Sequence, residues 1–170
     1  MEWTGARYAD GPTAECQQWI AAPPQRVWEL VSDISLMPEL STELQSAEWL
    51  HGANGPAAGN AFRGRNHHPA LGDWETTSYV VTCAPPHEFT WAVNDPERPT
   101  ATWSFALDER DGGTLLRQWT RMGPARSGLS RAIERMPDKE QKIVHNRLCE
   151  FEEAMSSALT GIKHRAEDRA

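Results

Sequence analysis

The C-terminal segment, residues 138–163, has the hydrophobic pattern of one long amphipathic helix. Asp138 follows a proline and is the predicted N-cap residue, and Gln141 stands three residues later, where a capping box has Glu or Gln. Charged residues occupy the other faces, so this helix needs an apolar surface to lie on. Its apolar side chains recur every three or four residues and therefore share one stripe; they are Val144, Leu148, Phe151, Met155, Leu159 and Ile162.

The segments before this helix alternate between apolar and polar residues, as β-strands do. Most of the later strands are separated by short turns, and Asp111-Gly112-Gly113 is a strong hairpin signal. Short turns between consecutive strands indicate antiparallel pairing, so we expect a meander. The seven predicted strands cover residues 13–20, 44–50, 60–67, 73–83, 87–94, 100–107 and 114–122.

Two short helical segments are expected between the first and second strands. Pro24 suits the first turn of a helix, and Val27, Leu30 and Val31 share one face of it. Residues 37–40 follow as a second short helix or a turn. Residues 123–136 form a longer connection, either a flap beside an opening or a short helix over residues 129–135.

This order of elements predicts an α+β fold. A curved seven-stranded antiparallel sheet would be wrapped around the long C-terminal helix, with two short helices after the first strand. We expect one domain over residues 13–165, preceded by a loose arm of residues 1–12 and followed by a tail of residues 166–170. The length of 170 residues fits one domain with a sizeable core.

Composition excludes several classes of partner. The net charge of −7 argues against a general nucleic-acid-binding protein and against an anionic membrane surface. No apolar run is long enough to insert into a membrane, and the first residues lack the pattern of a signal peptide. Cys16, Cys83 and Cys149 lack metal-type spacing, so we expect reduced thiols in a cytoplasmic protein.

The chain has eight Trp against two Tyr and four Phe. Trp74, Trp91, Trp103 and Trp119 all fall in predicted strands. Such residues either fill a core or line a cavity for a flat, apolar ligand. Trp91 and Trp103 lie on alternating apolar faces, so we expect both to point into the protein.

Several short segments occur in an order that is typical of one family. They are residues 20–33 (IAAPPQRVWELVSD), 62–66 (FRGRN), 74–78 (WETTS), 85–91 (PPHEFTW) and Gly113-Thr114. Together they resemble the START-like superfamily, also called SRPBCC or polyketide cyclase/dehydrase-like, over residues 13–163. The resemblance implies a helix-grip fold with a deep, mostly apolar pocket between the sheet and the long helix. Members bind lipids, hormones, polyketides and other hydrophobic molecules, and some catalyse cyclisation, dehydration or aromatisation of polyketides.

The predicted pocket residues come from neighbouring strands and the helix. Phe62, Gly64 and Asn66 share one strand face, and Thr76 and Ser78 share another. If both faces point to the helix, they contribute polar groups to the pocket; the alternative is that Thr76 and Ser78 face solvent. The predicted ligand-binding residues are Phe62, Asn66, Trp74, Thr76, Ser78, Trp91, Trp103, Phe105, Leu148, Phe151 and Met155.

The family has no single catalytic signature, so no catalytic residue is assigned. Arg65, Asn66, Glu75 and Gln118 are candidates for acid–base or oxyanion-binding roles. The charged candidates also suit a solvated hairpin rim. Alternation leaves the face of Gln118 open, because both faces of its strand carry apolar residues.

No metal or cofactor is expected. His67 and His68 are neighbours on a strand and point to opposite faces, so they cannot readily bind one metal together. His145 lies one step off the helix stripe, either exposed or at a pocket mouth. Motifs of serine hydrolases, phosphate-binding loops, zinc peptidases and dinucleotide-binding enzymes are absent from the sequence.

Three hypotheses follow. The first is a protein that binds a small hydrophobic or aromatic molecule, such as a lipid, between the sheet and the C-terminal helix. The second is a polyketide cyclase, aromatase or dehydratase of secondary metabolism that acts on such a ligand without metal or nucleotide cofactor. The third is a structural or interaction protein that engages a partner through a sheet edge or a groove. The oligomeric state stays open, with a homodimer as one alternative.

Overall fold

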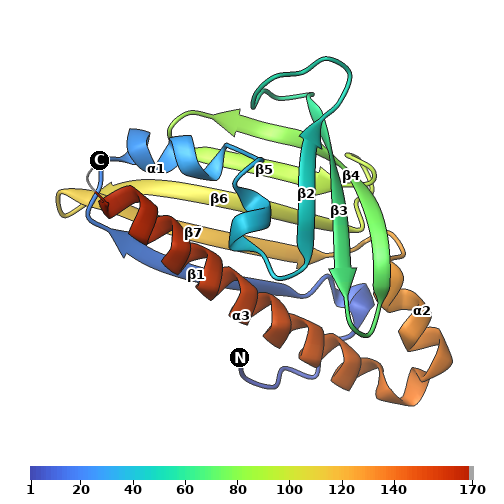
Figure 1. The fold of residues 1–170 in the computed structure, drawn as a ribbon. Helices are drawn as coiled ribbons and strands as arrows, with labels where there is room; N and C mark the ends of the chain where they lie inside the picture. The colour runs from blue at the N-terminus through green and yellow to red at the C-terminus, as the bar shows by residue number, and fades with distance from the viewer. Residues whose placement is uncertain (169–170) are drawn as a thin grey trace.

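A strongly curved sheet and one long helix dominate the fold (Figure 1). In the computed structural model, which describes residues 1–168, seven antiparallel strands pair in the order β1-β7-β6-β5-β4-β3-β2. The meander predicted for the last six strands is therefore confirmed, and β1 joins it beside β7. The strands are β1 (Thr13–Ile20), β2 (Leu44–Trp49), β3 (Ala61–His68), β4 (Gly72–Ala84), β5 (Glu88–Val93), β6 (Ala101–Arg110) and β7 (Gly113–Met122).

Helices occupy the concave side and the ends of this sheet (Figure 1). The long helix α3 (Glu140–Glu167) crosses the concave face, as expected. Helix α1 (Pro24–Val31) and the short turn η2 (Met37–Leu40) carry the chain from β1 to the opposite edge at β2. The long connection contains helix α2 (Gly128–Arg135), and two more single turns are η1 (Tyr8–Asp10) and η3 (Pro137–Lys139). No helix among residues 1–168 combines the length and apolar character needed to span a bilayer.

Both ends of α3 differ from the sequence-based expectation. Asp138 lies in η3 and does not cap the helix, whose N-cap residue is Lys139. Gln141 donates its side-chain N–H to the carbonyl of Gly5 at 2.6 Å, so it is not part of a capping box. At the other end α3 continues to Glu167 and buries Ala166, beyond the expected domain boundary at residue 165. Residues 169–170 of the expected tail lie outside the described residues.

The N-terminal arm is fastened to the protein at several points. Arg7 forms an ion pair with Glu140 at 3.0 Å, and the Tyr8 hydroxyl donates to the carbonyl of Ala125 at 2.7 Å. The ring of Trp3 meets that of His145 edge-on at 5.0 Å. The arm therefore packs along the first turns of α3, in contrast to the loose segment expected from its composition.

Glycines at the β6–β7 hairpin explain how β1 reaches this part of the sheet. Asp111 and Gly112 both have positive φ, as a tight two-residue hairpin requires. A Cβ atom on Gly113 would lie 2.3 Å from the backbone oxygen of Ile20. The absence of a side chain at Gly113 thus allows the end of β1 to approach the start of β7.

Two groups of buried side chains pack between the sheet and α3. The large cluster surrounds α1, and the small cluster lies nearer α2. Cys16 and Trp103, both half-buried, pack against both clusters. Leu159 belongs to the large cluster and Met155 to the small one, so the division falls within one turn of α3. The large cluster includes Ile20, Val27, Phe89, Phe105, Leu116, Leu159 and Ile162; the small cluster consists of Ala14, Met122, Val144, Leu148 and Met155.

Candidate functional site

The hairpin of β3 and β4 presents its predicted pocket residues on one face. Phe62 pairs with Ser78, and Asn66 pairs with Trp74, so these side chains point to the same side. The Phe62 ring lies 6.1 Å from that of Trp91, which places this side on the concave face. Ser78 is buried, and Asn66, Trp74 and the neighbouring Thr76 are half-buried, so the alternative in which Thr76 and Ser78 lie on the outer face is wrong.

A row of aromatic side chains extends from this hairpin to the long helix. Trp91 and Trp103 point inward as predicted, and their rings are nearly parallel with centroids 6.5 Å apart. Phe105 packs against Trp91 at 5.9 Å, and Phe151 of α3 meets Trp103 edge-on at 5.0 Å. Trp103 and Phe151 remain half-buried, so part of this aromatic surface stays accessible.

The three pocket residues predicted on α3 differ in their burial. Leu148 and Met155 are buried in the small cluster, whereas Phe151 is only partly buried and packs against that cluster. The structure therefore leaves Phe151 as the accessible member of the three.

The four catalytic candidates do not form one site. Asn66 and Gln118 point to the concave face, whereas Arg65 and Glu75 lie on the outer face and form an exposed ion pair at 2.9 Å. Successive strand residues point to opposite faces, which separates Arg65 from Asn66. A joint role for all four candidates is therefore excluded, and the rim interpretation fits Arg65 and Glu75.

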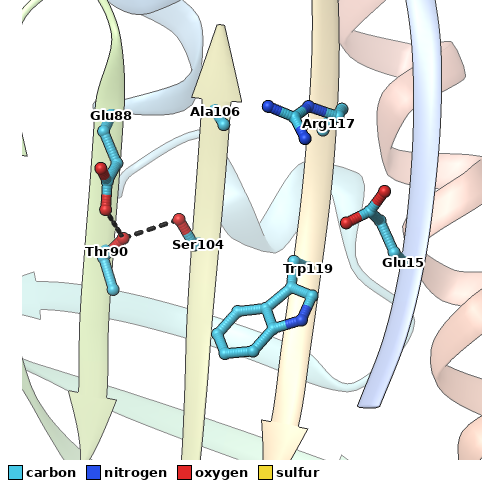
Figure 2. A pocket seen from close by; sticks show the side chains of 7 residues that line it. All are labelled: Glu15, Glu88, Thr90, Ser104, Ala106, Arg117 and Trp119. Carbon is cyan, nitrogen blue, oxygen red and sulfur yellow. Dashed lines mark hydrogen bonds between the residues drawn. The ribbon is translucent and has the colours of Figure 1, made fainter.

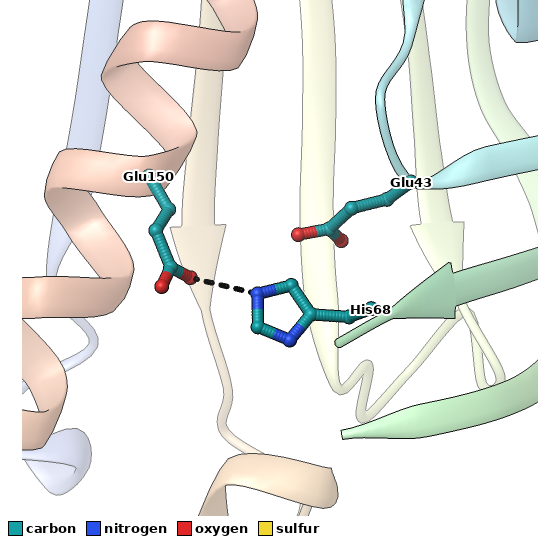
Figure 3. Close-up of side chains that lie close together, drawn as sticks. All are labelled: Glu43, His68 and Glu150. Atoms are coloured by element: carbon teal, nitrogen blue, oxygen red, sulfur yellow. Dashed lines mark ion pairs between the residues drawn. The ribbon is translucent and has the colours of Figure 1, made fainter. Parts of the chain in front are cut away.

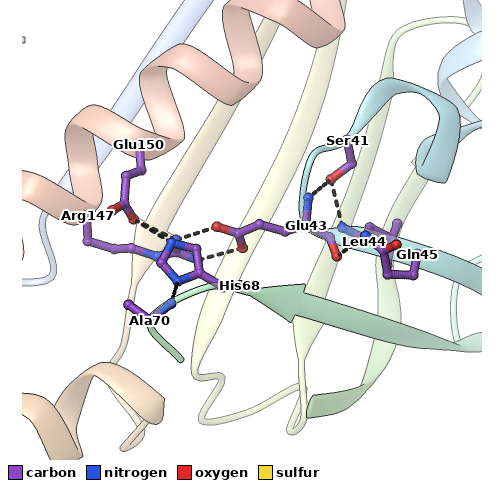
Figure 4. Close-up of polar contacts among 8 residues, drawn as sticks. All are labelled: Ser41, Glu43, Leu44, Gln45, His68, Ala70, Arg147 and Glu150. Carbon is purple, nitrogen blue, oxygen red and sulfur yellow. Dashed lines mark hydrogen bonds and ion pairs between the residues drawn. The ribbon is translucent and has the colours of Figure 1, made fainter. Parts of the chain in front are cut away.

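A charged cluster that the sequence did not predict joins α3 to the far edge of the sheet (Figure 4). Arg147 is buried, with 9% of its surface exposed. It donates to both carboxylate oxygens of Glu43, at 2.5 and 2.8 Å, and to Glu150 at 2.8 Å. The Arg147 guanidinium also lies 4.4 Å from the centre of the Phe151 ring, so the cluster adjoins the aromatic row.

Backbone contacts hold Glu43 in place for this interaction. The Ser41 hydroxyl accepts hydrogen bonds from the N–H groups of Glu43 and Leu44, at 3.1 and 2.9 Å. The Glu43 carbonyl accepts the N–H of His67 at 2.9 Å, which ties this turn to β3. Burial alone would lower the pKa of Arg147, but the hydrogen bonds and charges of Glu43 and Glu150 outweigh it and raise that pKa.

The sequence does contain an indication that Arg147 is buried and needs a charged partner. Arg147 lies three residues after Val144 and four before Phe151, which are positions of the same stripe. A charged residue at such a position requires a partner, but the identity of Glu43 could not be inferred from local spacing.

His68 completes the cluster and raises the question of a metal (Figure 3). One ligand atom each from Glu43, His68 and Glu150 lies within 4.8 Å of the others. The Arg147 guanidinium, however, already forms ion pairs with both carboxylates. His68 Nδ1 accepts the N–H of Ala70 at 3.1 Å, so a neutral ring carries its proton on Nε2, which faces Glu150 at 3.7 Å. These residues do not fit a metal centre, because a cation would have to displace Arg147.

We therefore expect equimolar Zn²⁺ to leave the melting temperature of the protein unchanged. Arg147 supplies the positive charge that a metal would otherwise supply, and competition with it opposes metal binding. Differential scanning fluorimetry with and without a chelator measures this, and Arg147→Met is the matched variant that frees the carboxylates. A rise in melting temperature for the unmodified chain would contradict the assignment of the cluster as an ion-pair network.

Two surface depressions lie away from the aromatic row. The first, of about 290 Å³, is on the outer face of the sheet, where small side chains of β6 form the floor (Figure 2). Its hydroxyl groups are satisfied, because Thr90 is hydrogen-bonded to Glu88 at 2.8 Å and to Ser104 at 2.6 Å. The second is an open groove of about 820 Å³ beside α3, lined by Met1, Cys16, Glu152, Glu153, Ser156, Ser157 and Thr160.

Comparisons with known proteins agree with this architecture. The model of a family described as polyketide cyclase / dehydrase and lipid transport matches residues 12–142. A comparison with curated proteins found no match.

Solved structures extend the similarity over nearly the whole chain. The Polyketide_cyc-like protein Cgl2372 from Corynebacterium glutamicum is 29% identical, with a TM-score of 0.64 over 89% of this chain and 88% of that one. DR_A0006 from Deinococcus radiodurans is 15% identical, with a TM-score of 0.62 over 92% and 98%. The di-domain ARO/CYC BexL from the BE-7585A biosynthetic pathway is 16% identical, with a TM-score of 0.59 over 99% of this chain and 53% of that one. At this low identity, the last two structures show only that they and this chain have the same fold.

Proposed function

Because this chain belongs to the polyketide cyclase/dehydrase and lipid transport family, we propose that it binds a small hydrophobic or aromatic molecule between the sheet and α3. The observation that carries this proposal is the partial exposure of Trp103 and Phe151, two large aromatic side chains on facing elements. Full burial of such rings stabilises a protein, so a core packed only for stability would cover them. A bound apolar molecule would cover them instead.

The chemistry of the surrounding surface suits such a ligand. Binding sites for small molecules combine an apolar, aromatic lining with a few placed polar groups. Here Trp91, Trp103 and Phe151 supply aromatic surface, and Asn66 and Thr76 supply half-buried polar groups on the β3–β4 hairpin. Gly64 lies between the two polar residues, and a Cβ atom on it would lie 3.1 Å from the Thr76 hydroxyl. Its missing side chain makes room for Leu44 and Thr76, whose side chains cover this part of β3.

A cyclase or dehydratase that acts on such a ligand is the second candidate. Asn66 and Gln118 favour it, because both amides point to the concave face and can orient a carbonyl or hydroxyl group. Neither amide titrates, however, and general acid–base catalysis needs a group that gains and loses a proton. The charged candidates Arg65 and Glu75 lie on the other side of the sheet. Binding therefore stands as the first proposal.

Intrinsic fluorescence tests the binding proposal. Titration with 2-naphthol or oleate at micromolar concentrations is expected to change the Trp emission of the unmodified chain. Trp103→Phe should remove most of this change, because Trp103 faces α3. The matched variant Trp119→Phe should retain it, because Trp119 points to the outer face. Unchanged emission with both compounds, or a response lost in Trp119→Phe and kept in Trp103→Phe, would contradict binding at this place.

A further inference from the structure

Gln118 is the one amide on the inward face of β7, where its neighbours on that face are Leu116 and Thr120. It is buried, with 8% of its surface exposed. Thr120 is also buried, but its hydroxyl donates to the carbonyl of Thr102 at 3.1 Å. The side-chain oxygen of Gln118 is buried and has no hydrogen-bond partner within residues 1–168.

An unpartnered oxygen of this kind is costly. Burial strips the carbonyl of water, and without a replacement donor the free energy of the folded protein rises. Leucine or methionine would fill a similar volume without this penalty. Gln118 therefore lowers the stability of the folded protein relative to an apolar residue, and a role in stability alone does not explain it.

The nearest strand neighbours do not supply the missing donor. Gln118 pairs across the sheet with Phe105 on one side and Cys16 on the other. Phe105 has no donor, and the Cys16 thiol donates to the carbonyl of Glu152 at 3.4 Å. Burial raises the pKa of this thiol, so Cys16 keeps its proton and its bond to α3.

The position of Gln118 coincides with the division of the core. Phe105 belongs to the large cluster, and Cys16 packs against both clusters. Trp103, which also contacts both clusters, pairs with Thr120, so it is the diagonal neighbour of Gln118 on the same face. Gln118 is thus the diagonal strand neighbour of the half-buried Trp103, which carries the proposed binding function.

We propose that Gln118 orients the ligand, because its side-chain carbonyl accepts a hydrogen bond from a hydroxyl group on a flat aromatic molecule. The ring of this molecule lies against Trp103 and Phe151, and its phenol-type hydroxyl points to β7. This assignment rests on the proposed binding function and deepens it, since it names the chemical class of the ligand. Gln118 acts here as a positioning and specificity-determining residue.

A pair of compounds that differ in one group tests the assignment. The compounds are 2-naphthol and 2-methylnaphthalene, in which a methyl group replaces the hydroxyl at similar size. Isothermal titration calorimetry gives the ratio of their dissociation constants for the unmodified chain and for Gln118→Met. Loss of one hydrogen bond should shift this ratio about fivefold to tenfold against 2-naphthol. Affinity for 2-methylnaphthalene should stay equal or increase.

Control variants separate this role from a structural one. Gln17→Met changes an exposed glutamine of β1 and should leave the ratio unchanged. The melting temperature of Gln118→Met should be maintained or raised, since the change removes an unpartnered carbonyl. Gln118→Leu serves the same comparison if the methionine variant does not fold.

Each result has a distinct meaning. A ratio that is the same in Gln118→Met and the unmodified chain overturns the assignment of Gln118 and leaves the binding function standing. A lowered melting temperature with an unchanged ratio assigns Gln118 to a structural water or partner and also overturns it. Failure of the unmodified chain to bind either compound refutes the binding function, and the role of Gln118 with it.

Discussion

Glu43→Gln is expected to lower the free energy of unfolding by about 2–3 kcal/mol. Arg147 is buried and donates to both oxygens of Glu43, so loss of this carboxylate leaves a buried cation with Glu150 as its remaining charged partner. Glutamine still accepts one hydrogen bond, which keeps the loss below that of a fully uncompensated charge. Urea unfolding followed by Trp fluorescence gives the value.

The outer face of the sheet provides a matched control. Glu75→Gln removes the partner of Arg65 in a pair whose side chains are 55% and 61% exposed, and such pairs contribute about 0–1 kcal/mol. The double variant Glu43→Gln/Arg147→Met should recover much of the lost stability, because it removes the charge that needs the carboxylate. Equal losses for Glu43→Gln and Glu75→Gln would show that burial of Arg147 has no energetic consequence.

Leu159→Ala and Phe151→Ala are expected to separate stability from ligand binding along α3. Leu159 is 1% exposed and lies in the large cluster, so its truncation should cost about 2–5 kcal/mol and leave the affinity for 2-naphthol unchanged. Phe151 is half-buried and faces Trp103, so its truncation should cost less stability. It should weaken binding of 2-naphthol about tenfold, because the ligand loses one aromatic wall.

Unfolding curves and calorimetric titrations of the two variants decide this prediction together. Glu153→Ala, on an exposed face of the same helix, is the control and should change neither quantity appreciably. If Phe151→Ala lowers stability alone, α3 is a core element along its whole length. The half-buried aromatic surface would then have no ligand to explain it.

Local sequence signals predicted most of the fold. The bounds of β1 were predicted to the residue, because alternation and the following prolines mark it clearly. The prediction of the apolar stripe on α3 is also confirmed, because all six of its residues belong to the buried clusters or pack against them. The largest strand error is β6, which continues to Arg110 and not to residue 107. Its last three residues are charged and exposed, so they carry no hydrophobic signal, and only pairing with β7 makes them a strand.

The features that the sequence did not predict depend on contacts between distant residues. Both faces of β7 carry a leucine, so the side of Gln118 is decided by its pairing with Cys16 and Phe105. Arg147 is one of the charged residues expected on the other faces of the helix, but it is buried and paired with Glu43, which lies 104 residues earlier. Periodicity describes one element at a time, so it identifies neither the side of Gln118 nor the partner of Arg147.

The divided core has a consequence for the kinetics of ligand exchange. The two clusters meet at Cys16 and Trp103, so we expect the first half of α3 to open locally while the large cluster stays intact. The ion pair of Arg147 with Glu43 lies on this half and opposes its opening. If a molecule binds as proposed, we expect Gln118 and the aromatic row to determine its affinity, and the Arg147 cluster to determine how fast it enters and leaves.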